Sequence, residues 1–367
     1  MSERHDPVVT VIIPVRNEAA YIQQTLAQIH DQTYPKPLTE VIVADGMSTD
    51  DTRAIVARFA AEHPELDLKV LSNPKCLSSA GRNLAIAHGR GEYFLLIDGH
   101  VFIPRRDLIR TAVELACQHG ARVLGRPQPL SPPGIDPFQR AVAVARTSWL
   151  AHSQESHIYS ETEDWVSPLS VATMYHASVF AEVGMFDEQF DAAEDVELNY
   201  RLERQGIRCF TSPRLAVHYY PRRSLPELFR QMVRYGRGRA AFIRKHPERF
   251  RLELLAPAAV VLAAPLGVVL GTVSVWALAA FAALGGLYAG ALMIESLRLN
   301  RRHGSRFFGK VPCIIATIHA GLGVGLISGA LRALTPAVSG GAPAGGAPPT
   351  RDETQTGTSR YSARAKE

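Results

Sequence analysis

Cysteine is scarce in this sequence, and no two cysteines are close together. The 367 residues include four cysteines, Cys76, Cys117, Cys209 and Cys313. Their spacing argues against a disulfide framework, a zinc ribbon or an iron–sulfur site, so we expect the N-terminal part of the chain to fold in a reducing compartment. That part also lacks the apolar run of a secretory signal before its first strand-like segment, and we therefore expect it to stay in the cytoplasm.

Two phosphate-binding motifs are missing as well. No GxGxxG follows the first strand-like segment, and no Walker-type lysine loop occurs. Ordinary dinucleotide-binding and P-loop folds are therefore disfavoured. The net charge is only +5. Because the basic residues gather beside apolar segments, we expect membrane lipid as a partner and no nucleic acid.

Charged residues are absent from 254–294, a run of 41 residues. One helix needs about 20 apolar residues to cross a bilayer, so this run predicts two spans joined by a turn near 271–274. A second apolar run, 311–331, is long enough for a third span. A buried hairpin in a soluble protein is the less favoured alternative, because core helices of this length usually carry a polar face.

Basic segments flank the first two predicted spans. Residues 214–251 hold eleven Lys or Arg and two acids, and residues 296–310 hold five basic residues and no acid. The positive-inside tendency places both segments on the cytoplasmic side of a multi-pass protein of the inner or plasma membrane. After residue 335 the composition changes to Gly, Ala, Pro, Ser and Thr, which predicts a disordered tail. The predicted parts are a soluble domain with an interfacial helix (1–245), a membrane region of about three helices (252–334) and the tail (335–367).

The first 126 residues alternate between β-branched runs and helical patterns. Strands are predicted at 8–13, 40–44, 68–72 and 92–97, and helices at 18–30, 49–63 and 78–88. This alternation is typical of an α/β fold with a mainly parallel sheet covered on both faces. Ligands of such sheets bind beyond the carboxyl ends of the strands. Polar residues stand at three of these ends: Arg16, Asn17 and Glu18, then Asp45 and Ser48, then Asp98 and His100.

The region 127–165 interrupts this alternation. It begins with several prolines and then shows the pattern of an amphipathic helix at 138–150. A long insertion of this kind can form a lid or an acceptor-facing element, and it can equally be a packing connector. The sequence leaves both interpretations open.

Six phrases of the sequence occur in the order and spacing of a known family. They are VIIPVRNE (11–18), VIVADGMSTDDT (41–52), SSAGRNLAIAHGRGEYFLLIDGH (78–100), VGMFDEQF (183–190), AEDVELNYRLERQGIRC (193–209) and QMVRYGRG (231–238). They resemble a family 2 glycosyltransferase of the GT-A fold, and more narrowly the membrane-associated succinoglycan-biosynthesis type of glucosyltransferase. The resemblance covers roughly residues 8–245. It implies a nucleotide-sugar-binding α/β domain followed by C-terminal transmembrane helices.

The resemblance implies a UDP-sugar donor. It assigns the nucleoside to the loop with Pro14, Arg16 and Glu18 and to Asp45, and it assigns a nucleotide contact to Arg82. Ionised carboxylates accept hydrogen bonds from ribose hydroxyls or a uracil N–H, and uracil is inferred from Asp45 alone. The alternatives are capping or turn roles for the two acids and a solvated helix face for Arg82.

The expected metal site departs from the family pattern. The family usually has Asp-x-Asp after the fourth strand, whereas this sequence has Asp98-Gly99-His100. A divalent ion, Mn²⁺ or Mg²⁺, would stabilise the charge of the leaving diphosphate. Asp98 supplies the oxygen ligand that such ions prefer, and His100 offers an imidazole, which suits Mn²⁺ better than Mg²⁺. We expect a metal-dependent protein that favours Mn²⁺, with a non-ligating His100 as the alternative.

Two adjacent acids, Glu194 and Asp195, lie in the first turn of a helix predicted at 195–205. Carboxylates at this position complement the helix dipole, which is one reason for their presence. The resemblance assigns the catalytic base to the second acid of the pair. Asp195 would then take the proton of an attacking hydroxyl with Glu194 as support. Direct attack with one base inverts the anomeric centre.

A third group of candidate residues is Gln231, Arg234 and Tyr235. It resembles the Gln-x-x-Arg-Trp motif of processive polysaccharide synthases, with Tyr in place of Trp. The resemblance implies that Arg234 holds the diphosphate and that the Tyr235 ring flanks the acceptor sugar. The alternative is an amphipathic interfacial helix whose arginines face lipid phosphate, and both roles can hold together.

These observations predict an inverting glycosyltransferase that moves a hexose onto a polyprenyl-linked oligosaccharide. UDP-glucose is the expected donor, exopolysaccharide or cell-envelope glycan the expected product, and other polysaccharide-assembly enzymes are candidate protein partners. The alternatives are a polyprenyl-phosphate sugar synthase and a non-catalytic nucleotide-sugar-binding membrane scaffold. A processive synthase is less favoured, because three spans are too few for a polymer channel.

Overall fold

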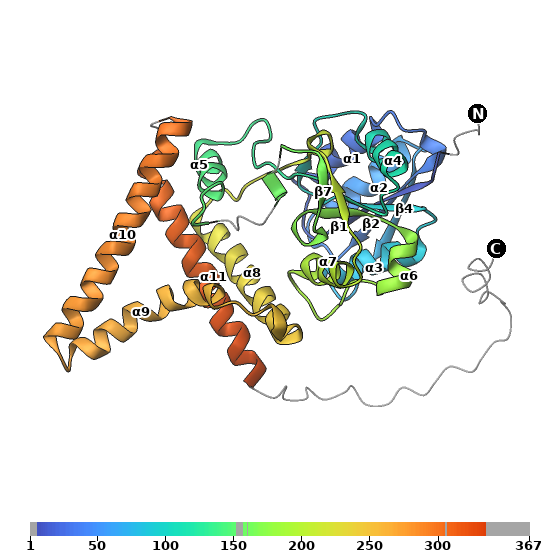
Figure 1. Ribbon diagram of the computed structural model, residues 1–367. Coiled ribbons are helices and arrows are strands. Elements are labelled where there is room, and N and C mark those ends of the chain that lie inside the picture. The colour runs from blue at the N-terminus through green and yellow to red at the C-terminus, as the bar shows by residue number, and fades with distance from the viewer. Residues whose placement is uncertain (1–5, 152–156, 160, 305–306, 335–367) are drawn as a thin grey trace.

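The computed structural model describes residues 6–151, 157–159, 161–304 and 307–334. The predicted tail, 335–367, lies outside the described residues. Figure 1 shows an α/β domain on one side, the long helices α9, α10 and α11 on the other, and α5 and α8 between them. The predicted fold class is confirmed.

Eight strands form one mixed sheet in the order β3-β2-β1-β4-β8-β6-β9-β7. Strands β3, β2, β1 and β4 are parallel to one another, and β8 is antiparallel to both of its neighbours. A separate pair, β5 and β10, is antiparallel. The bounds are β1 Val9–Val15, β2 Thr39–Asp45, β3 Asp67–Ser72, β4 Tyr93–Leu96, β5 Val101–Phe102, β6 Val123–Gly125, β7 Asp164–Val166, β8 Ala172–His176, β9 Cys209–Thr211 and β10 His218–Tyr219.

Helices cover both faces of the sheet, as the alternating pattern predicts. Alternate residues of β1 point to opposite faces, so that Val11 packs with α1, α2 and α4 while Ile12 packs with α3, α6 and α7. The bounds of these helices are α1 Ile22–His30, α2 Thr52–Glu62, α3 Ser78–His88, α4 Leu108–His119, α6 Ala177–Val183 and α7 Glu194–Arg204. Short 3₁₀ helices lie at Lys36–Leu38, His157–Tyr159, Pro168–Ser170, Pro213–Leu215, Pro247–Arg249 and Leu252–Leu255.

Helices α1 and α2 begin three or four residues later than the sequence predicts. The loops before them bond to each other. The N–H of Asn17 donates to Ser48 Oγ at 2.9 Å, and the N–H of Thr49 donates to Asn17 Oδ1 at 2.8 Å. Because these side chains link the two loops, residues expected in the first helical turns form the edge of the site described below.

Helix α5 (Pro137–Arg146) belongs to a helical group beside the α/β domain. Asp136 caps its N-terminus, and Ala141 and Ala145 face a second apolar core. That core also contains residues of α8 (Leu225–Lys245), of the C-terminal part of α10 and of α11 (Val311–Leu334). We call α5, α8, α11 and residues 292–303 of α10 the helical platform. The packing of α5 in it favours the connector over the lid.

The 41-residue uncharged run forms two helices, α9 (Ala256–Gly271) and α10 (Val275–His303). The turn between them lies where the sequence predicts it. Within the described residues, three helical segments are long and apolar enough to cross a membrane: Leu252–Gly271, Val275–His303 and Val311–Arg332.

Glycines bring α11 and α8 into backbone contact. A Cβ atom added to Gly236 would lie 2.8 Å from Gly325 Cα, and one added to Gly321 would lie 2.9 Å from the Phe229 carbonyl oxygen. A Cβ on Gly329 would lie 2.8 Å from Ala240 Cβ. Both helices therefore run in the same direction, side by side, over at least three turns.

Candidate active site

The carboxyl edge of the parallel strands carries unusual backbone. Among the described residues, four that are not glycine have left-handed φ values, 58° at Asn17, 56° at Met47, 57° at Cys76 and 65° at Ala193. The first three follow β1, β2 and β3, and Ala193 precedes α7. Such conformations cost roughly 1–3 kcal/mol each and concentrate at functional sites. The sequence pattern gave no sign of them at Met47, Cys76 or Ala193.

Asp45 ends β2 and is almost fully buried. Its carboxylate accepts a hydrogen bond from the N–H of Ser48 at 3.3 Å and pairs with Arg53 Nη1 at 3.2 Å. The carboxylate therefore fixes the loop after β2, and a contact with a nucleoside would add to these partners. Pro14 lies inside β1, and Arg16 is exposed just beyond that strand.

Arg82 connects two of the predicted acids. It lies in the first half of α3, with its guanidinium 3.0 Å from Glu194 Oε1 and 3.8 Å from Asp98 Oδ1. The ring of Phe186 lies 5.3 Å below the guanidinium carbon. Burial opposes the charge of Arg82, but the carboxylates of Glu194 and Asp98 outweigh it and raise the pKa of the guanidinium. Arg82 is thus a bridge between the end of β4 and the start of α7, and its surface-helix alternative is wrong.

Glu194 and Asp195 are neighbours in two different environments. Glu194 is buried against Arg82, and burial raises its pKa against the opposing charge of that guanidinium. Asp195 is exposed to solvent at the same helix terminus. An exposed carboxylate can reach a hydroxyl of a bound molecule, whereas a buried and paired one cannot do so without losing its partner.

The predicted metal residues lie together at the end of β4. Asp98 and His100 are 30% and 23% exposed, and His100 Nδ1 bonds Glu18 Oε1 at 2.9 Å. Burial opposes protonation of His100, but Glu18 outweighs it and raises the pKa of the imidazole. A carboxylate on one ring nitrogen leaves Nε2 for a metal, an arrangement that metal-binding histidines commonly use. The donor atoms of these two residues fit a divalent ion, whose remaining ligands would come from substrate oxygens and water.

Two residues of this site were missed by the sequence analysis. Arg126 follows β6, is 2% exposed, and donates from Nη2 to Tyr219 Oη at 3.1 Å and to the Leu96 carbonyl at 2.8 Å. The Tyr219 ring lies edge-on to His100, with centroids 6.2 Å apart. Arg126 was detectable as a charged residue directly after an apolar strand. Tyr219 was not, because only the small β5–β10 sheet brings it to Asp98 and His100.

Helix α8 holds the segment that precedes the two acids. Arg234 donates from Nε and Nη2 to the Asp191 carbonyl at 3.1 and 2.6 Å. A Cβ atom on Gly238 would lie 2.6 Å from the Ala192 carbonyl oxygen, so α8 and this segment are in direct contact. Gln231 Nε2 bonds Tyr235 Oη at 3.3 Å, and the Tyr235 side chain is exposed. Of the three motif residues, Arg234 therefore contacts the segment before Glu194, and Gln231 and Tyr235 contact each other on the same helix.

Comparison with known proteins identifies the family. Residues 10–183 match the family model described as "Glycosyl transferase family 2", and residues 135–294 match "Glycosyl transferase family group 2". "Succinoglycan biosynthesis protein ExoA" of Rhizobium meliloti is 36% identical over 253 residues, which are 68% of this chain and 74% of the relative. The chain belongs to glycosyl transferase family 2.

Another relative of this family 2 glycosyltransferase matches over nearly the full length of both chains. It is "Dolichyl N-acetyl-alpha-D-glucosaminyl phosphate 3-beta-D-2,3-diacetamido-2,3-dideoxy-beta-D-glucuronosyltransferase" of Methanococcus voltae, 24% identical over 332 residues, 88% of this chain and 97% of the relative. The enzyme is thus related to glycosyltransferases of exopolysaccharide and lipid-linked oligosaccharide synthesis.

A solved structure has the same fold. It is described as "Mannosyltransferase PcManGT from Pyrobaculum calidifontis in complex with GDP-Man and Mn2+". The TM-score is 0.56 at 23% identity, with 90% of this chain and 88% of that chain covered. The similarity confirms the GT-A-like arrangement of the sheet and its helices.

Proposed function

We propose that this family 2 glycosyltransferase transfers a hexose, with UDP-glucose as the expected donor, to a hydroxyl of a polyprenyl-linked oligosaccharide with inversion. The observation that carries the proposal is the split between Glu194, buried on Arg82, and Asp195, exposed beside it. Glu194 stabilises the site through its ion pair with Arg82, and Asp195 remains available as a base. A binding scaffold would need only the first.

The reaction needs three things from the chain. Asp195 takes the proton of the acceptor hydroxyl while the hydroxyl oxygen bonds the anomeric carbon and the bond from that carbon to the donor diphosphate breaks. Arg234 compensates charge on the departing diphosphate from the platform side. Pro14, Arg16, Glu18 and Asp45 line the nucleoside end, and Arg82 keeps Asp98 and Glu194 in place through its two ion pairs.

Asp98 and His100 would hold a divalent ion, with Mn²⁺ favoured, and such an ion supplies positive charge to the leaving diphosphate. Glu18 orients the His100 ring by its bond to Nδ1. Tyr219 packs against the His100 ring and is itself held by a hydrogen bond from Arg126. We expect excess chelator to stop transfer and Mn²⁺ to restore it better than Mg²⁺.

Two arginines of the helical platform support an acceptor that carries phosphate. The Nε atom of Arg146, at the end of α5, is buried and has no hydrogen-bond partner among the described residues. Desolvation and the nearby Arg146 charge lower the pKa of Arg239 on α8. Two guanidinium groups that repel each other suit a diphosphate, which would relieve their repulsion.

The proposed place of this enzyme is the cytoplasmic face of the inner or plasma membrane. Two membrane spans, α9 and α10, are supported by their exposed apolar side chains. Helix α11 is better explained as part of the helical platform. Gly236 contacts α11 and Gly238, two residues later, contacts the loop before Glu194. Because α8 touches both, we propose that α11 lies beside the soluble domain and outside the bilayer core.

An energetic argument favours the same arrangement. Contact between α8 and α11 extends from Phe229 to Ala240, roughly 17 Å at 1.5 Å per residue, more than half of a 30 Å hydrocarbon layer. If α11 spanned that layer, Arg230, Arg234 and Arg237 would enter it. Each arginine costs about 3 kcal/mol at the centre of a bilayer, so the three together would offset much of the gain from inserting a whole apolar helix.

The experiment is transfer of labelled glucose from UDP-glucose into extractable lipid by membranes that contain the enzyme. We expect Asp195→Asn to lower transfer roughly 100-fold or more while UDP binding stays unchanged. Glu182→Gln, an exposed acid on α6, is the matched control and should transfer normally. Equal transfer by Asp195→Asn would contradict the base assignment.

The outcomes also separate the alternatives. A mild effect of Asp195→Asn, with a product that is a single sugar on lipid phosphate, would indicate a polyprenyl-phosphate sugar synthase, because a phosphate acceptor needs no base. UDP binding without transfer from UDP-glucose, UDP-galactose or GDP-mannose would indicate a scaffold. Arg146→Gln and Arg239→Gln should raise the KM for the lipid acceptor and leave the KM for the donor unchanged.

A further inference from the structure

A second cluster of metal-ligating side chains lies far from the candidate active site. His30 is the last residue of α1, His63 follows the end of α2, and Glu65 precedes β3. Helices α1 and α2 begin near the carboxyl edge of the parallel strands and run back along the sheet. Their C-terminal ends are therefore at the opposite edge, roughly 14 Å away for a nine-residue helix. The cluster is separate from Asp98 and His100.

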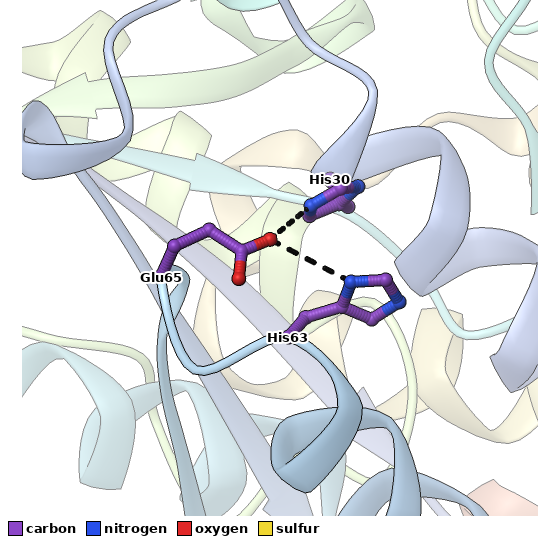
Figure 2. Close-up of side chains that lie close together, drawn as sticks. All are labelled: His30, His63 and Glu65. Carbon is purple, nitrogen blue, oxygen red and sulfur yellow. Dashed lines mark hydrogen bonds and ion pairs between the residues drawn. The ribbon is translucent and has the colours of Figure 1, made fainter.

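The three side chains converge on one point. Figure 2 shows the Glu65 carboxylate directed toward both imidazole rings. Glu65 Oε1 lies 2.6 Å from His30 Nε2 and 3.6 Å from His63 Nδ1. One ligand atom from each residue lies within 4.8 Å of the others. In a tetrahedral zinc site with bonds of about 2.0–2.1 Å, ligand atoms are about 3.3 Å apart, so only small side-chain movements are needed.

The surroundings favour a cation. The C-terminal carbonyl ends of α1 and α2 both face this region, and a helix C-terminus attracts positive charge. Asp31 Oδ1 lies 3.7 Å from His30 Nδ1 and can orient that ring. The Phe59 ring packs against His63 with centroids 4.4 Å apart, which restricts the imidazole. One opposing charge is present, because Lys36 Nζ donates to the His30 carbonyl.

The cluster is also accessible. His30, His63 and Glu65 are 24%, 31% and 50% exposed, so an ion can enter without opening the fold. A charged His30–Glu65 ion pair would be the simplest use of two of these residues. It does not account for the third, because His63 Nδ1 is turned toward the same carboxylate oxygen.

We propose that His30, His63 and Glu65 form a surface binding site for a divalent transition-metal ion, with Zn²⁺ as the expected occupant. Two imidazoles and one carboxylate are ligands that Zn²⁺ uses, and water would take the fourth position. The ion would join the ends of α1 and α2 to the start of β3. It would stabilise this part of the sheet without taking part in glycosyl transfer, so the proposal does not depend on the proposed function.

The test is Zn²⁺ binding by the full chain in detergent, with any affinity tag removed and with excess Mg²⁺ present. Calorimetry should show a Zn²⁺ site that His63→Ala and Glu65→Gln each weaken at least tenfold. His88→Ala, an exposed histidine at the end of α3, is the matched control and should bind normally. Co²⁺ should give the intense visible absorption of a four-coordinate site in the parent and the control only. The unfolding midpoint should rise with Zn²⁺ in these two proteins alone.

Two results would overturn the proposal. One is the absence of Zn²⁺ binding by the parent protein, which would leave the cluster as an ion pair. The other is equal Zn²⁺ affinity in the parent, His63→Ala and Glu65→Gln. If the three proteins bind Zn²⁺ equally, His100→Ala shows where the ion binds, because loss of binding in this variant would place the ion at the active site. Glu65→Gln keeps the size of an exposed side chain, so its circular dichroism and UDP binding should match the parent.

Discussion

The α9–α10 pair and α11 are apolar segments of similar length and hydropathy, yet they have different surroundings. In the most apolar window of α9 and of α10, 11% and 6% of the residues are buried inside the protein, against 50% for α11. Large apolar side chains such as Leu266, Val275 and Trp276 are exposed along α9 and α10. In α11, Ile314, Ile315 and Ile318 are buried at 0–1% exposure.

This difference shows that an apolar helix must be shielded from water, but that its sequence does not decide whether lipid or protein shields it. The exposed apolar side chains of α9 and α10 are shielded from water only if lipid covers them. Water is already excluded from α11 by α5, α8 and α10, whose side chains form the core of the helical platform. A helix that is apolar on all sides suits either a membrane or a protein core. The first two predictions below test whether α11 belongs to the second class, and the other two test how α8 joins the platform to the soluble domain.

The largest expected effect is all-or-none and concerns topology. In a background without the native cysteines, Val273→Cys at the α9–α10 turn and Leu331→Cys near the end of α11 are labelled with a membrane-impermeant maleimide. We expect intact cells to label position 273 only, and permeabilised cells to label both. Both positions are exposed on the protein, at 83% and 57%. Labelling of position 331 in intact cells would show that α11 crosses the membrane.

A bulky residue at the contact between α8 and α11 should be nearly as severe. Gly325→Leu would place a side chain against Gly236 and the backbone of α8, which costs about 3 kcal/mol because backbone cannot move aside easily. We expect a lower unfolding midpoint and loss of transfer. Gly290→Leu on α10 is the control, since no atom lies within 4 Å of a Cβ at Gly290. Equal unfolding midpoints for the two variants would contradict close packing of α11 against α8.

A smaller change on the other face of α8 should affect catalysis and leave the membrane attachment intact. Gly238→Ala would push against Ala192, which lies two residues before Glu194. We expect kcat to fall about tenfold, as a displacement near 1 Å can produce larger losses, with UDP binding and membrane extraction unchanged. Gly285→Ala on α10 has open space and should be neutral. A normal kcat for Gly238→Ala would show that α8 does not position the acids.

The smallest effect is a pH dependence where the end of α8 meets α7. Lys245 Nζ lies 2.6 Å from Asp187 Oδ2 and 2.7 Å from Glu197 Oε1. Burial opposes the charge of both acids. The bond to Lys245 outweighs burial at Asp187, and the bonds to Arg201 and then to Lys245 outweigh it at Glu197, so the pKa values of both acids are lowered. The added stability is therefore present above their ordinary pKa values, about 4, and is lost as the pH falls through the lower folded-state values.

Lys245→Met should weaken this dependence, because Glu197 keeps its ion pair with Arg201. The cost should be about 1 kcal/mol, since the lysine is partly exposed and solvent screens the pairs. The measurement is the unfolding midpoint between pH 6 and pH 3 for the parent and the variant. Parallel curves for the two proteins would show that Lys245 does not link α8 to the soluble domain. Lys75→Met, at an exposed pair with Glu188, is the matched control.

Much of the candidate site could be predicted because its residues follow strands. Asp45 ends β2, and Asp98 and His100 follow β4. The carboxyl ends of parallel strands meet at one edge whatever the rest of the fold does. The pairing of Arg82 with Glu194 was out of reach, because 112 positions separate them in the sequence and the pair forms only when α3 and α7 pack on the same face of the sheet. Tyr219 was missed for the same reason.

The sequence by itself determined the alternation of strands and helices, the acids at the strand ends, the paired acids in the first turn of α7 and the α9–α10 hairpin. These features depend on local periodicity, on charge and on apolar length, which neighbouring residues already define. Only the tertiary structure decided which acid of the pair is buried, how α8 connects the platform to the loop before Glu194, and that three side chains from the ends of α1 and α2 and from the segment before β3 meet. It also decided what surrounds α11, because the partner of an apolar surface is chosen by packing between distant segments.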